Sequence, residues 1–157
     1  MVSTAAPTVA RVHPARAAVV LVIATIVAIA LNALIATAAV AFGASASYGP
    51  LTAPAYASMT ILGIAAGWVG WRLISRRSAH PRRALAIAVP VVLALSFAPD
   101  LLLGIFRFIP GTTTDAVLAL ALMHVVTAAV AVPAYVVASP RLEAPASAPR
   151  KYVSFRN

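Results

Sequence analysis

Apolar residues form four long stretches along this chain, and polar positions interrupt them only rarely. A helix needs ~20 mainly apolar residues to cross a hydrocarbon layer ~30 Å thick, at ~1.5 Å of rise per residue. Four stretches meet this requirement, over residues 17–42, 53–74, 84–108 and 116–138. No window between them is long enough for a soluble domain. The pattern predicts an all-α, four-helix transmembrane bundle with short loops.

The segments outside these spans carry turn and cap signals. Residues 43–50 are small and turn-rich, and Pro110–Gly111 ends the third span. Thr114 and Asp115 suit the N-cap of the fourth helix. We expect residues 17–138 to form one membrane domain. A short N-terminal segment (1–16) precedes it, and a basic, proline-rich tail (139–157) without stable structure follows it.

The first span also resembles a secretory signal peptide in two respects. An arginine-bearing start precedes it, and Ala44-Ser45-Ala46 resembles a cleavage site. Its apolar core, however, is far longer than the ~7–15 residues of a signal h-region. We therefore expect it to be retained as a membrane helix.

Composition supports a membrane protein and excludes several other classes. The chain is 62% hydrophobic and 10% charged, with a mean hydropathy of +0.98. A soluble domain is typically ~45–50% apolar and ~25% charged. The chain contains no cysteine, which excludes disulfide scaffolds, thiolate metal sites and thiol redox chemistry.

Positive charge lies almost entirely on one side of the predicted topology. The chain has 12 Lys+Arg against 3 Asp+Glu, and only Arg107 falls on the other side. The positive-inside rule then predicts cytoplasmic termini in the plasma membrane. Such charges contact anionic lipid head groups, and no nucleic-acid partner is expected because no binding fold accompanies them. The inner-side residues are Arg11, Arg16, Arg72, Arg76, Arg77, Arg82, Arg83, Arg141, Arg150, Lys151 and Arg156.

Aromatic and small residues suggest how the spans sit and pack. Trp68 and Trp71 mark the inner end of the second span as interface anchors. Gly63, Gly67 and Gly70 form a small-residue stripe that lets a neighbouring backbone approach. The stripe is interpreted as packing within the bundle, with dimerisation as the alternative. An outer aromatic belt is expected at Tyr48, Tyr56, Phe106 and Phe108.

Polar residues inside the spans are the informative positions, because each one costs free energy in lipid. Counting from the span ends places both Asp100 and His124 ~12 Å below the outer interface. The predicted layer at this depth contains Asn32, Ser58, Thr60, Ser96, Asp100 and His124. One interpretation is a hydrogen-bonded cluster that stabilises the bundle. The other is a proton-responsive or ligand-binding site that uses Asp100 and His124.

Two features complicate the pairing of Asp100 with His124. Pro99 can break the third span so that Asp100 starts a new turn. Arg107, two turns further along, is an alternative partner for the carboxylate. Prolines also interrupt the third and fourth spans at Pro90 and Pro133, where kinks are expected.

Catalytic and metal sites find little support. Ser96, His124 and Asp100 are the residue types of a hydrolytic triad, but no glycine-flanked nucleophile motif accompanies them. A metal site needs three or four convergent ligands, and the spans hold one histidine. We therefore expect no catalytic residues, metal or cofactor.

Several short motifs occur together along the chain. They are Ala66-Gly67-Trp68, the arginine-rich inner loop, Leu95-Ser96 with Pro99, and Leu122-Met123-His124. Together they resemble a family of small four-helix membrane proteins of unknown function from high-GC actinobacteria, over roughly residues 17–137. The richness in alanine and the use of arginine over lysine agree with that origin. The resemblance implies topology and plasma-membrane location but no activity, and its matching positions here are Trp68, Ser96, Pro99 and His124.

The sequence thus predicts an integral plasma-membrane protein without enzymatic activity. The leading interpretation is a structural or accessory component in which Asn32, Ser96, Asp100 and His124 stabilise the bundle. The alternative is a small proton-coupled transporter or pH-responsive sensor that uses Asp100 and His124. A homo-oligomer or a membrane-protein partner would fit either interpretation.

Overall fold

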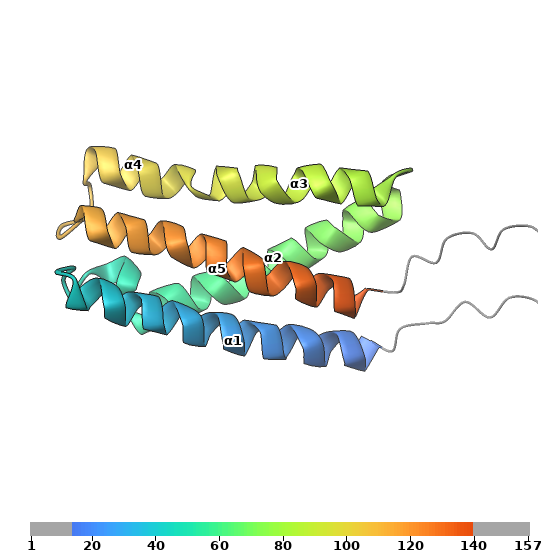
Figure 1. Cartoon of the computed structure of the whole chain (residues 1–157), viewed down its shortest axis with the longest axis horizontal. Helices are drawn as coiled ribbons and strands as arrows, with labels where there is room; N and C mark the ends of the chain where they lie inside the picture. Colours follow the sequence, from blue (N-terminus) through green and yellow to red (C-terminus); the bar gives the residue numbers. More distant parts are fainter. Residues whose placement is uncertain (1–13, 140–157) are drawn as a thin grey trace, which may run out of the picture.

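A computed structural model describes residues 14–139, and this range is helical with no strands (Figure 1). Its helices form four candidate membrane spans, long and apolar enough to cross a bilayer. This confirms the predicted all-α, four-helix class. Arg11 and nearly all of the predicted basic tail lie outside the described residues. The elements are α1 (Pro14–Ala41), η1 (Gly49–Leu51), α2 (Ala53–Arg77), α3 (Pro81–Ser96), α4 (Ala98–Phe106) and α5 (Thr114–Ala138).

Helices α1 and α5 share the most extensive interface of the bundle and run side by side (Figure 1). Their facing sides are built mainly from alanine, which allows two helix backbones to approach closely. The fully buried Ala28 of α1 is an example. Large apolar side chains such as Ile26 and Leu34 point outward instead, as expected for a surface that faces lipid. The buried residues of α1 are Ala17, Ala24, Ala28, Asn32, Ala36 and Ala39.

The third span is broken into two helices. Helix α3 ends at Ser96, and α4 begins at Ala98 with Phe97 between them. Pro99, in the first turn of α4, has no N–H to continue the hydrogen-bond ladder of α3. The break that the sequence suggested at Pro99 is therefore present. Pro90 and Pro133, by contrast, stand inside helices that continue past them.

The loops at the α4–α5 end correct two sequence predictions. The N-cap of α5 is Thr113, whose hydroxyl accepts a hydrogen bond from the backbone N–H of Ala116 (3.2 Å). Thr114 is instead the first helical residue. Thr113 can cap the helix because its backbone is extended, which places the Thr113 hydroxyl over the first turn. Tyr48 is 1% exposed and bonds Thr112 (3.2 Å), so it joins two loops rather than an interfacial belt.

Candidate functional site

The predicted polar layer separates into two groups of contacts. Asn32 of α1 meets Thr60 of α2 and the α5 residue Thr127, and we call these three the core cluster. Asp100 of α4 meets His124 of α5, and we call these two the hinge pair. No hydrogen bond or ion pair within residues 14–139 connects the two groups. Counting depth along each span predicted Asn32, Thr60, Asp100 and His124 in one layer. It predicted neither the contact with Thr127 nor the division into two groups.

In the core cluster, one amide ties three spans together. Asn32 is 2% exposed, and its Nδ2 donates to Thr60 Oγ1 (2.9 Å) and to Thr127 Oγ1 (3.2 Å). The Thr60 hydroxyl itself donates to the Tyr56 carbonyl (2.7 Å), so its oxygen must accept from Asn32. This fixes the orientation of the amide. Asn32 Oδ1 is buried without a donor among the described residues.

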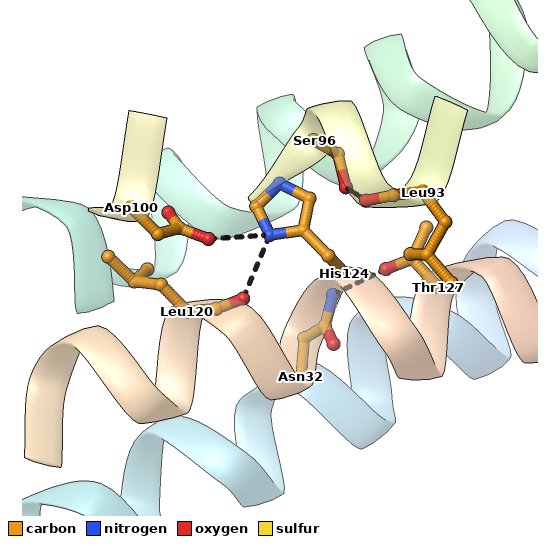
Figure 2. A network of polar contacts seen from close by, with 7 residues as sticks. All are labelled: Asn32, Leu93, Ser96, Asp100, Leu120, His124 and Thr127. Carbon is orange, nitrogen blue, oxygen red and sulfur yellow. Dashed lines mark hydrogen bonds and ion pairs between the residues drawn. The ribbon is translucent and has the colours of Figure 1, made fainter. Parts of the chain in front are cut away.

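In the hinge pair, two acceptors face one imidazole nitrogen (Figure 2). His124 Nδ1 lies 2.9 Å from the Leu120 carbonyl oxygen and 3.1 Å from Asp100 Oδ2. A carbonyl can only accept, so Nδ1 carries a proton, and Leu120 receives it in the better geometry. Asp100 Oδ2 has no other donor within the described range. A second proton on the imidazole would therefore bind at the other ring nitrogen, Nε2.

The hinge pair lies at the break in the third span. Asp100 is 6% exposed and sits in the first turn of α4, where helix N–H groups favour a negative charge. The imidazole of His124 contacts the Phe97 ring edge-on, with the ring centroids 6.1 Å apart. His124 therefore contacts both the junction residue and the first turn of α4. Its side chain is 39% exposed, so one side of the pair remains open.

Two other predicted members of this site have different partners. The Ser96 hydroxyl donates to the Leu93 carbonyl of its own helix (2.7 Å; Figure 2). Within residues 14–139 it makes no hydrogen bond to His124 or Asp100, so the triad of residue types is not assembled. Arg107 is exposed and forms no described ion pair with Asp100. Arg107 instead ends α4 in the left-handed conformation (φ 47°).

Of the three glycines in the α2 stripe, only Gly67 has another helix packed closely against it. A Cβ on Gly67 would overlap the hydroxyl of Tyr135, whereas Gly63 and Gly70 have open space at that position. The Tyr135 hydroxyl donates to the Ile64 carbonyl (2.7 Å), which holds the ring against α2. Tyr135 was not among the residues predicted from sequence, although it lies one turn after the small residue Ala131 on the buried face of α5.

The two tryptophans pack around the same tyrosine. The rings of Trp68 and Trp71 each lie 5.7 Å from the ring of Tyr135, measured between centroids. Trp71 Nε1 also donates to Ser139 Oγ (2.8 Å), and the guanidinium of Arg72 lies 5.3 Å from the centroid of Trp68. Both tryptophans thus have a packing role between α2 and α5, whatever they contribute at a membrane interface.

Four apolar helices with two polar clusters between them form a helical bundle, a class compatible with a multi-pass membrane protein. The chain belongs to DUF6069, a family of unknown function, whose model matches residues 9–141. The resemblance to a family without an assigned activity is therefore confirmed. No curated protein and no solved structure matches the chain.

Proposed function

We propose that this chain is a non-catalytic structural or accessory component of the plasma membrane, whose buried polar contacts hold the four spans in register. The core cluster is the observation that carries this proposal. Asn32 connects α1, α2 and α5 through its own amide. A polar group buried in hydrocarbon is expensive to leave unpaired, so each such contact favours one arrangement of the helices.

The distribution of basic residues supports an orientation with both termini in the cytoplasm. The start of α1 and the α2–α3 turn lie at one end of the bundle, and the end of α4 lies at the other (Figure 1). Within the described range, Arg16 and the arginines around the turn belong to the first end, and Arg107 ends α4 at the second. The arginine-rich end is then the cytoplasmic one. The use of 11 arginines against one lysine further supports a high-GC, actinobacterial origin. The partners in this role are the bilayer and a second membrane protein or a second copy of this chain.

Two assays on the same variants test the proposal. Wild type, Asp100→Asn and His124→Ala are compared by thermal unfolding in detergent. The same proteins are then tested for collapse of a pH gradient across liposomes that contain a trapped pH-sensitive dye. The proposal expects lower stability in both variants and no proton flux that depends on the protein. Wild-type flux that either substitution abolishes, with stability unchanged, would contradict it and favour a proton-coupled transporter.

A pH-responsive sensor is the second candidate, and one observation favours it. His124 contacts the carboxylate of α4 and the ring of Phe97 at the α3–α4 break. A proton on Nε2 places a full positive charge beside Asp100, which changes how α4 docks on α5. Because the chain lacks cysteine, Ile105→Cys and Leu118→Cys can carry paired spin labels on these two helices.

For the sensor, we expect the distance between the two labels to differ between pH 5 and pH 8. The His124→Gln substitution should abolish that difference, because glutamine does not titrate. Ser96→Ala is the matched control, since its hydroxyl bonds only its own helix. A label distance that is the same at both pH values in the parent protein would rule the sensor out.

A further inference from the structure

A shallow hollow lies where α2 turns into α3, at the arginine-rich end of the bundle. Its volume is about 260 Å³. The lining combines a guanidinium, an imidazole and a hydroxyl with small and aliphatic side chains. These residues are Ser78, Ala79, His80, Arg83, Ala84 and Ile87.

The polar side of the hollow is positively charged. Arg83 is exposed and has no hydrogen-bond or ion-pair partner within residues 14–139. Arg76 and Arg77 close α2 immediately before the turn and add to the positive potential there. Neither α2 nor α3 contains an acidic residue to neutralise this charge. The hollow therefore complements an anion.

The other side of the hollow is apolar and continues along the span. Ile87 follows Arg83 by one helical turn and is 58% exposed, and Val91 follows by a second turn and is 48% exposed. The three side chains therefore lie along one face of α3, with the cation at the end of the helix and the aliphatic groups deeper in the membrane. This order matches a molecule with a charged head and a hydrocarbon chain.

We propose that this hollow binds an anionic phospholipid. Its phosphate contacts Arg83 and His80, and one acyl chain lies along Ile87 and Val91. Arginine suits this role because its guanidinium forms paired, charge-assisted hydrogen bonds with phosphate oxygens. A soluble phosphate would pair with the Arg83 guanidinium but would make no contact with the apolar face of Ile87 and Val91. The inference rests on the chain spanning a membrane and is independent of the accessory role proposed above.

The test counts lipids bound to the full chain in detergent by native mass spectrometry. Phosphatidylglycerol and phosphatidylcholine with identical acyl chains are titrated separately. We expect the first phosphatidylglycerol to bind about fivefold more tightly, the effect expected of one basic residue near an anionic head group. Arg83→Gln should remove most of this preference. Arg107→Gln, which removes an exposed arginine at the other end, should leave it intact.

Three results would overturn the assignment. The first is equal affinity of the wild type for the two lipids. The second is a loss of preference in Arg76→Gln as large as in Arg83→Gln, which would show a diffuse charge effect rather than this hollow. The third is displacement of the bound lipid by glycerophosphoglycerol, which carries the same head group without acyl chains. That displacement would identify a site for soluble phosphate esters.

Discussion

At the scale of single residues, polar side chains in this bundle satisfy their hydrogen bonds in two different ways. Thr25 and Thr37 each donate to a carbonyl four residues earlier in the same helix, at 2.8 Å. These bonds remove the cost of a hydroxyl in lipid without connecting one helix to another. The side-chain amide of Asn32 instead donates its hydrogen bonds to residues of two other spans, α2 and α5. Only the second kind of contact fixes the relative position of helices.

The Asn32→Ala substitution should therefore destabilise the bundle. We expect a loss of about 1 kcal/mol in the free energy of unfolding, because interhelical hydrogen bonds in membrane proteins average ~0.6 kcal/mol and Asn32 makes two. The measurement is unfolding in mixed micelles with increasing SDS. Thr37→Ala is the matched control, since it removes a polar group of α1 that bonds only its own helix. Equal losses in the two variants would refute an interhelical role for Asn32.

The hinge pair should show energetic coupling between its two members. In a double-mutant cycle of Asp100→Asn and His124→Ala, we expect a coupling of about 1 kcal/mol, in the range found for residues in direct contact. Ser96→Ala combined with His124→Ala should be additive, because Ser96 bonds Leu93 instead. Both cycles are read from unfolding in detergent at fixed pH. Energetic coupling between Ser96 and His124 would contradict this expectation and support the triad interpretation.

At the scale of elements, the contact between α2 and α5 depends on one glycine. The ring of Tyr135 lies against Gly67, its hydroxyl bonds the Ile64 carbonyl, and Trp68 and Trp71 pack on it. A tyrosine held by these contacts cannot swing aside to accept a methyl group. Gly63, one turn earlier on α2, has open space where its Cβ would be.

Adding the same methyl group at these two glycines should have opposite effects. Gly67→Ala is expected to cost about 1–3 kcal/mol, the usual penalty for overpacking a filled site. Gly63→Ala should be neutral or stabilising by up to ~1 kcal/mol, because alanine is the better helix former. Thermal unfolding in detergent distinguishes them. Tyr135→Phe removes the overlapping hydroxyl and should recover part of the loss in the Gly67→Ala background. A failure of any recovery would argue against this contact.

The elements themselves were predictable from sequence, but their rotations about their own axes were not. Span length follows from runs of apolar residues, and the break at Pro99 follows from the missing N–H. Depth along the spans also follows from counting, which placed Asp100 and His124 at the same level, where the structure pairs them. Which way a side chain points depends on packing against neighbours. Apolar residues surround α1 and α5 on all sides, so the sequence did not show which neighbour Asn32 or His124 faces.

At the scale of the whole molecule, the bundle is asymmetric from end to end. All of its described arginines except Arg107 belong to the end that contains the start of α1, the α2–α3 turn and the end of α5 (Figure 1). The opposite end holds the two other interhelical loops, with Arg107 as its described basic residue. A membrane protein with this charge distribution has one favoured orientation, because lysines and arginines near the spans are retained on the cytoplasmic side. The three connections between the spans are short, so none of them carries a domain large enough to override that preference.

The absence of native cysteine allows a direct test of this orientation. Ala46→Cys and Ala79→Cys place one thiol each in exposed positions of the α1–α2 and α2–α3 connections. If both termini are cytoplasmic, a membrane-impermeant maleimide added to intact cells should label the first variant and not the second. Permeabilised cells should label both, which controls for thiol accessibility. The reverse pattern would place the arginine-rich end outside the cell, where the positive-inside rule does not allow it.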